Sequence, residues 1–320
     1  MLVSVIVPTR DRPALLHTAL AVIGQQSHAE VEVVVVDDGS LPDNGRANEA
    51  LVAALGRASS YRYIDSREQG GSGPSVARNA GLKAARGELI AFCDDDDEWC
   101  DVEHLAAAVA VFRESVDVDL VFGNQDTSIR GQRGGQPWLP LLAQRLRLDA
   151  RQDGERIRLA RAECLIDHFP HLNTCVFRRA LLDRAGGFWE GVRYSEDMDL
   201  YVRAIERARG VVYRHHTVSI HHVPDPTQAT SASTRLSPIE KELTMAAVAN
   251  HLLETCPSAA AQRYARRVAG FAYRRLALAE ARANNPKGAL AFARLGLAIW
   301  PGARWFAYTG WLAARAWSRP

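Results

Sequence analysis

Four consecutive aspartates, residues 94–97, directly follow an apolar run at residues 89–93. The run has the composition of a buried strand, so the acidic block would lie at its carboxyl end, where open α/β sheets bind their ligands. Adjacent carboxylates repel one another, and their oxygens suit Mg²⁺ or Mn²⁺, especially where a diphosphate completes the coordination. The block therefore predicts a divalent-metal site. The alternative is a solvated acidic loop or the first turn of a helix.

The elements that must position this block alternate along the first part of the chain. Strands are expected at residues 2–7, 31–36, 61–64 and 89–93, with helices near 14–26 and 44–55 and from residue 75. This alternation predicts an α/β fold with a mostly parallel sheet flanked by helices. Later strands are expected at residues 118–123, 173–179, 211–213 and 218–220.

Polar residues end the first, second and fourth predicted strands. Because the carboxyl ends of parallel strands meet at one edge of a sheet, we expect Thr9, Arg10, Asp38 and the aspartates along one rim. A glycine-rich loop at residues 70–73 has neither dinucleotide-binding spacing nor a phosphate-binding lysine. It is either a connector that approaches a ligand or a plain linker.

The composition is that of a globular protein with one main domain and an appendage, at 320 residues with 47% hydrophobic and 24% charged. Five scattered cysteines without zinc-like spacing indicate reduced thiols. The chain shows no signal-peptide pattern and no apolar run of ~18 residues. These features predict a cytoplasmic protein, with the inner face of the plasma membrane as a further possibility.

The C-terminal region is expected to be all helical, with a catalytic domain at residues 1–237 and a helical region at 238–320. Residues 257–320 carry eleven Arg or Lys and one acid, so they contribute +10 to a chain of net charge +2, and the rest carries −8. Aromatics among arginines in residues 300–317 suit a membrane interface. The alternative is a helix packed on its own protein or on a dimer partner. Residues 224–237 are expected to form a mobile loop that closes over a ligand.

Four short motifs occur in a fixed order in the first half of the chain: residues 3–9, 33–40, 77–81 and 92–97. They read Val-Ser-Val-Ile-Val-Pro-Thr, Val-Val-Val-Val-Asp-Asp-Gly-Ser, Ala-Arg-Asn-Ala-Gly and Phe-Cys-Asp-Asp-Asp-Asp. Their order and spacing resemble the signatures of bacterial family 2 glycosyltransferases with the GT-A fold, over residues 1–225. The resemblance implies a Rossmann-like GT-A sheet that binds a nucleoside-diphosphate sugar.

The resemblance also implies which residues bind this donor. The nucleotide-binding residues would be Pro8, Thr9, Arg10, Asp38, Arg78, Asp94 and Asp95. Residues 94–96 match the family's DxD motif, so Asp96 is the expected ligand of Mn²⁺ or Mg²⁺, with Asp97 in support. His222, or its neighbour His221, is expected as a further metal ligand, and the alternative is a surface or hydrogen-bonded histidine.

Glu196 and Asp197 resemble the family's Glu-Asp catalytic motif, with Asp197 as the general base for an acceptor hydroxyl. The pair also lies at the expected start of a helix after Ser195, so the structural alternative is an N-terminal cap with acids in the first turn. Asp199, two residues further on, is expected to point elsewhere.

The resemblance implies an inverting, metal-dependent and non-processive transfer of a sugar. The donor would be a UDP-sugar, as is usual in this family. The acceptor would be a hydroxyl of a saccharide or lipid-linked saccharide, in surface polysaccharide or glycolipid synthesis. Processive relatives carry a Gln-x-x-Arg-Trp motif, whereas Pro301 precedes Arg304-Trp305 here. The alternatives are a nucleotidyltransferase, for which the glycine-rich loop after the first strand is missing, or a catalytically silent carbohydrate- or membrane-binding subunit. A homodimer formed through the C-terminal helices also stays open.

Overall fold

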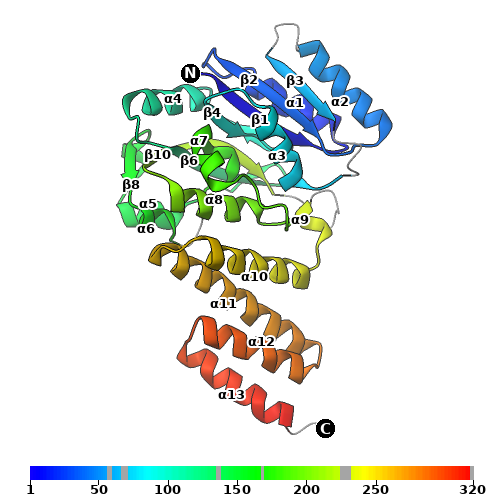
Figure 1. The fold of residues 1–320 in the computed structure, drawn as a ribbon, viewed down its shortest axis with the longest axis vertical. Helices are drawn as coiled ribbons and strands as arrows, with labels where there is room; N and C mark the ends of the chain where they lie inside the picture. The colour runs from blue at the N-terminus through cyan, green and yellow to red at the C-terminus, as the bar shows by residue number, and fades with distance from the viewer. Residues whose placement is uncertain (56–59, 66–70, 135–137, 167–168, 224–231, 318–320) are drawn as a thin grey trace. The chain divides into compact units, whose positions relative to one another are not determined.

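The computed structural model describes residues 1–55, 60–65, 71–134, 138–166, 169–223 and 232–317. Two compact units make up the chain, Met1–Asp225 and Pro226–Pro320 (Figure 1). The boundary that we expected at residue 237 lies within the second of these units.

The first half of the sheet is parallel, as the alternation predicts. Its strands are β1 (Val3–Thr9), β2 (Val31–Asp37), β3 (Tyr61–Asp65) and β4 (Leu89–Phe92), in the order β3-β2-β1-β4. The connecting helices are α1 (Pro13–Ile23), α2 (Pro42–Leu55) and α3 (Pro74–Ala84). Thr9 pairs with Asp37, so β1 and β2 end at the same level of the sheet. The prediction of a mostly parallel α/β sheet flanked by helices is confirmed.

The second half of the sheet is mixed and continues the order as β4-β9-β6-β10-β5. These strands are β9 (Cys175–Arg178), β6 (Leu120–Ile129), β10 (Val211–His222) and β5 (Glu98–Trp99); β7 (Gln132–Arg133) pairs with β6, and β8 (Arg156–Leu159) with β10. β9 is antiparallel to both of its neighbours, whereas β10 runs parallel to β6. The two short strands expected at 211–213 and 218–220 are one strand whose register shifts between Tyr213 and Ser219. The first residues of the expected strand 173–179 belong instead to a 3₁₀ turn, η4 (Leu172–Thr174).

The remaining helices of the first unit follow β5 and β6 along the chain. They are α4 (His104–Glu114), α5 (Pro140–Leu146), α6 (Arg161–Cys164), α7 (Arg179–Ala185) and α8 (Glu196–Arg207), with a 3₁₀ turn η3 (Ala150–Gln152).

The core of the first unit explains why its strands read as continuous apolar runs. Residues such as Val5, Val35 and Ala91 are fully buried, because helices cover the sheet and no face of these strands meets water. Helix α3 packs closely on the sheet at Gly81, where an added Cβ would overlap the side chain of Ile6. This close packing fixes the position of α3, and therefore of Arg78 one turn earlier.

The second unit consists of the helices α9 (Ala232–Arg235), α10 (Pro238–Thr255), α11 (Ala259–Arg282), α12 (Pro286–Ile299) and α13 (Ala303–Trp317). From α10 onward each helix packs on the next, and Ser237, Ser258 and Asn285 cap the first three of them. Of the mobile loop expected at residues 224–237, residues 224–231 lie outside the described residues, and α9 follows directly. Among the described helices, none is both long and apolar enough to cross a membrane.

His104, the first residue of α4, gives the fold a defined response to acid. Its imidazole is buried and packs edge-to-face with the ring of Trp99, at 5.1 Å between ring centres, and burial lowers its pKa to about 4. The folded chain therefore keeps His104 neutral between pH ~6.5 and ~4, while the unfolded chain takes up a proton. The contribution of His104 to the free energy of unfolding is therefore complete above the pKa of the unfolded chain. It decreases by up to about 3 kcal/mol as the pH is lowered through this window.

Urea unfolding at about pH 7.5, 6 and 5 would measure this, with His104→Phe as the comparison because phenylalanine keeps the ring and cannot titrate. We expect the stability of the parent to fall relative to His104→Phe as the pH is lowered. A difference that does not change with pH would contradict the assignment.

Candidate functional site

The four aspartates after β4 lie at the rim predicted for them, and each faces a different set of partners. Asp94 meets Arg78, Asp95 and Asp96 meet Arg12, and Asp97 meets a histidine group. The block is therefore not a solvated acidic loop: Asp95 and Asp97 are buried. Each set of partners comes from a different element of the sheet edge.

Arg12, at the start of α1, bridges two of the four carboxylates. Its guanidinium lies 3.0 Å from Asp95 and 2.8 Å from Asp96, and Thr9 Oγ1 donates to Asp95 at 2.7 Å. Burial, and then the charge of Asp96, raise the pKa of Asp95 to about 7, although Arg12 opposes this. Thr9 lies where the sequence predicts it, whereas Arg12 was not among the expected residues.

Arg78 joins the end of β4 to the start of α8. It is 6% exposed, and its two terminal nitrogens lie 2.6 Å from Asp94 and 2.7 Å from Glu196. Burial by itself would raise the pKa of Asp94, but the adjacent Arg78 lowers it overall. For Glu196 burial prevails and the pKa is raised. One buried cation thus holds together two motifs that are far apart in the sequence.

Asp97 lies at the centre of a polar group built with two other segments, the η4 turn and the end of β10. Its oxygens accept hydrogen bonds from the side chain of Asn173 and from the backbone N–H of His222, the latter at 3.0 Å. His221 Nδ1 lies 3.0 Å from one oxygen, and His171 Nδ1 lies 3.8 Å from the other. One ligand atom from each of Asp97, His171 and His221 lies within 4.8 Å of the others.

The two metal ligands expected from the sequence, Asp96 and His222, are not in this group. Asp96 is paired with Arg12, and the His222 side chain is 45% exposed and 3.7 Å from Glu98. Neighbouring residues of a strand point to opposite faces, so only one of His221 and His222 can face Asp97 with its ring. His171 and Asn173 were not expected either, because no spacing in the sequence marks them.

Trp138 supports the two imidazoles of the group. Its ring centre lies 6.0 Å from that of His171 and 5.9 Å from that of His221, both edge-to-face, and its indole N–H donates to the carbonyl of Phe169 at 2.9 Å. The two imidazole rings are themselves 4.9 Å apart. The histidines are therefore held by packing on one side and by the carboxylate on the other.

Asp38 and Arg10 follow β2 and β1 at the same rim. The backbone N–H of Gly73 donates to one Asp38 oxygen at 3.0 Å, and the other oxygen is buried without a hydrogen-bond partner among the described residues. Burial raises the pKa of Asp38. Arg10 lies against Gly71, where an added Cβ would overlap its guanidinium. Gly73 has φ +100°, a conformation that favours glycine. The described part of the glycine-rich loop, residues 71–73, is thus a connector that reaches the rim.

Asp197 is half-buried in the first turn of α8, where the N–H of Met198 donates to it at 2.8 Å. Ser195 is the N-cap residue of α8, with φ 59°, and the acids lie in the first turn as the structural alternative expects, but the Ser195 side chain makes no capping hydrogen bond. Asp199 turns away from the rim, as expected, into a buried ion pair with Arg203.

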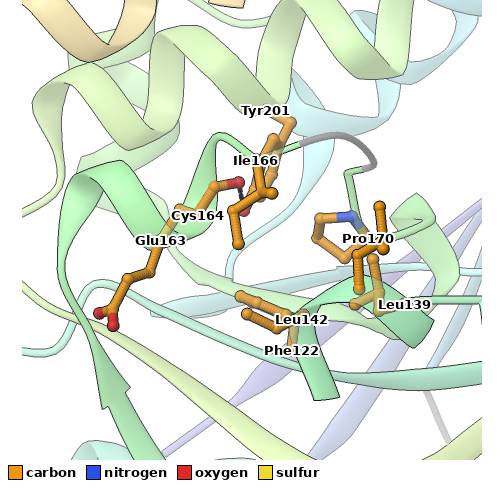
Figure 2. A pocket seen from close by; sticks show the side chains of 9 residues that line it. Phe122, Leu139, Leu142, Glu163, Cys164, Ile166, Pro170 and Tyr201 are labelled. Atoms are coloured by element: carbon orange, nitrogen blue, oxygen red, sulfur yellow. Dashed lines mark hydrogen bonds between the residues drawn. The ribbon is translucent and has the colours of Figure 1, made fainter. Parts of the chain in front are cut away.

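A small, mainly apolar pocket lies between β6, α5, α6 and α8 (Figure 2). Phe122, Leu142 and Pro170 line it, and Tyr201 closes it with a hydrogen bond to the carbonyl of Cys164 at 3.1 Å. Its free volume of about 10 Å³ is too small for a sugar ring. We therefore assign it no substrate, although Tyr201 is one helical turn from Asp197.

Arg78 is predicted to be the most costly of these side chains to remove. Arg78→Ala would leave the buried carboxylates Asp94 and Glu196 without their cation, and we expect a loss of about 3–5 kcal/mol in the free energy of unfolding, measured with urea. Arg46→Ala is the matched control, because Arg46 pairs with Asp43 on the surface and should cost less than ~1 kcal/mol. Equal effects of the two substitutions would contradict a structural role for Arg78.

Comparisons with known proteins identify the family of this chain. Residues 4–186, more than half of the chain, match the family model "Glycosyl transferase family 2". The uncharacterized protein y4gI of Sinorhizobium fredii is 29% identical over 258 residues, which are 79% of this chain and 26% of that protein. The GalNAc(5)-diNAcBac-PP-undecaprenol beta-1,3-glucosyltransferase of Campylobacter jejuni is 35% identical over 123 residues, 38% of this chain and 37% of the relative. The chain thus spans well under half the length of these two curated relatives.

Solved structures share the fold. S. aureus TarS 1–349 in complex with UDP-GlcNAc superposes with a TM-score of 0.64 at 20% identity, over 92% of this chain and 81% of that one. The mannosyltransferase PcManGT of Pyrobaculum calidifontis, in complex with GDP-Man and Mn²⁺, superposes with a TM-score of 0.59 at 21% identity, over 99% and 81%. At these identities the likeness shows the fold alone. Together with the family match, it places this chain in glycosyltransferase family 2.

Proposed function

We propose that the unit Met1–Asp225 transfers a sugar from a nucleoside-diphosphate sugar to a hydroxyl acceptor. The observation that carries this proposal is the arrangement of one rim, where Asp38 follows β2, Asp97 lies between β4 and β5, and Asp197 lies in the first turn of α8. Asp38 can accept a hydrogen bond from a nucleobase, and Asp97 can coordinate a metal ion. Asp197 can take the proton of an acceptor hydroxyl. A UDP-sugar is the first donor to test and a GDP-sugar the second, since related structures hold UDP-GlcNAc and GDP-Man.

The residues present fit a divalent cation. His171 Nδ1 is buried without a hydrogen-bond partner among the described residues and lies 3.8 Å from Asp97, and His171, Asp97 and His221 each offer a ligand atom within 4.8 Å of the other two. One carboxylate and two imidazoles favour Mn²⁺ over Mg²⁺, because imidazole is a poor ligand for the harder ion. We therefore assign the metal to Asp97, His171 and His221, in preference to Asp96 and His222. A cation held there would neutralise charge on the departing diphosphate.

The donor nucleotide is assigned to the ends of β1 and β2. The unpartnered oxygen of Asp38 is an acceptor that can take a ring N–H of uracil or guanine or a ribose hydroxyl. Pro8 and Thr9 lie beside it at the end of β1, and the guanidinium of Arg10 can stack on a base. Arg12 and Arg78 supply positive charge around Asp94–Asp96 without competing for Asp38.

Asp197 is assigned as the general base. It is half-buried and held at the first turn of α8, whereas Glu196 is occupied by Arg78. Proton transfer from the acceptor hydroxyl to Asp197, with direct attack on the anomeric carbon, would invert the configuration of the sugar in a single displacement. The acceptor is assigned only as a hydroxyl compound, a saccharide or lipid-linked saccharide.

Calorimetric titration with Mn²⁺ in the presence of UDP or GDP tests the metal assignment. We expect Asp97→Asn and His221→Ala to weaken Mn²⁺ binding by about 10- to 100-fold or more, because each removes a ligand. His222→Ala is the matched control on the same strand and should bind within about twofold of the parent. If Asp96→Ala and His222→Ala abolish binding while Asp97→Asn does not, the assignment to Asp97 is wrong.

Turnover of Asp197→Asn tests the base. Nucleotide release from UDP- and GDP-sugars, with simple glycosides as acceptors, should fall by about 10²- to 10⁴-fold while donor affinity stays the same. Asp183→Asn, at an exposed position of α7, is the control and should leave turnover unchanged. An Asp197→Asn variant as fast as the parent would exclude this role. A parent that binds no nucleotide would favour the silent-subunit alternative.

A further inference from the structure

Helix α13 presents an unusual outward face on the second unit. The exposed positions Ala303, Ala307, Gly310 and Ala314 follow one another at helical spacing and carry no charge. Two large apolar side chains flank them, Phe306 at 69% and Trp311 at 50% exposed. An ordinary surface helix places charged residues on the face away from its core.

The opposite face of α13 already has its partner. Leu312 is fully buried with Leu290 and Ala293 of α12, and the indole N–H of Trp305 donates to the carbonyl of Ala293 at 3.0 Å. Phe306 and Trp311 are thus not part of the core between α12 and α13. They belong to a second apolar surface on the same helix.

The edge of this surface is basic and aromatic. Tyr308 and Trp311 stack with ring centres 5.5 Å apart, and the guanidinium of Arg315 lies 5.3 Å from the Trp311 ring. Arg304 is exposed on the same side of the helix, and α13 contains no acidic residue. Residues 257–320 as a whole carry +10.

We propose that this face of α13, Phe306 and Trp311 with Arg304 and Arg315, docks on an anionic lipid surface. A second copy of the chain would bring an equal positive charge against the first and is disfavoured, whereas anionic headgroups complement it. Tryptophan and arginine side by side suit the headgroup layer, where the ring is half in hydrocarbon and the cation stays in water. The helix lies in the interface and does not span the bilayer.

Co-sedimentation of the full chain with phosphatidylcholine vesicles, with and without about 30 mol% phosphatidylglycerol, tests this. We expect binding to the anionic vesicles only, and a loss of binding when NaCl is raised from ~0.1 M to ~0.5 M. Phe306→Ser/Trp311→Ser should bind about tenfold more weakly. The double variant Arg304→Gln/Arg315→Gln should lose about fivefold in vesicle affinity for each arginine removed.

Val116→Ser is the control, because Val116 is the most exposed large apolar side chain among the described residues of the first unit, at 78%, and the substitution should not change vesicle binding. Circular dichroism of each variant checks that the helices remain. A parent that does not bind anionic vesicles, or a Phe306→Ser/Trp311→Ser variant that binds as the parent does, overturns the proposal. So does a parent that sediments as a dimer which this variant separates, because the face then belongs to a second copy.

Discussion

Four carboxyl groups on consecutive residues set the main constraint on this sheet edge. At such spacing the carboxylates repel one another, and burial makes each charge more costly. The fold meets this constraint by giving the aspartates different partners. Arg12 forms ion pairs with Asp95 and Asp96, and Arg78 forms one with Asp94. The side chains of Asn173 and the histidines contact Asp97. The elements that supply these partners, α1, α3, η4 and β10, are therefore tied to the end of β4 by electrostatics as well as by packing.

The same contacts order the two halves of the sheet relative to each other. The parallel half supplies the acidic block and Arg78, and the mixed half supplies α8 and the end of β10. Arg78 spans the two halves by pairing with Asp94 and Glu196, and Asp97 spans them through His221. A site assembled in this way keeps its geometry only while both halves are folded. The proposed nucleotide site at β1 and β2 and the proposed base in α8 lie on different halves and are thus linked by the buried ion pairs of Arg78.

Much of the parallel half could be predicted from the sequence, because a strand buried on both faces reads as an unbroken apolar run and each run here ends in polar residues. Thr9, Asp38 and the aspartate block accordingly follow β1, β2 and β4 at the rim expected for them. Arg12 escaped prediction because its partners are 83 and 84 residues away and nothing local marks it. The choice between His221 and His222 depends on which face of β10 meets Asp97, and the shift of register inside β10 hides that from any count along the sequence.

The close packing of α3 at Gly81 limits which mutations this chain can tolerate. A single added methyl group there would overlap Ile6 and force α3 away from β1, carrying Arg78 from between its two carboxylates. In a library of random variants, Gly81 should therefore be as intolerant of change as a residue that touches a ligand. The exposed positions of the same helix should accept many side chains. The number of side chains accepted at each position of α3 would then be smallest where the helix lies against the sheet.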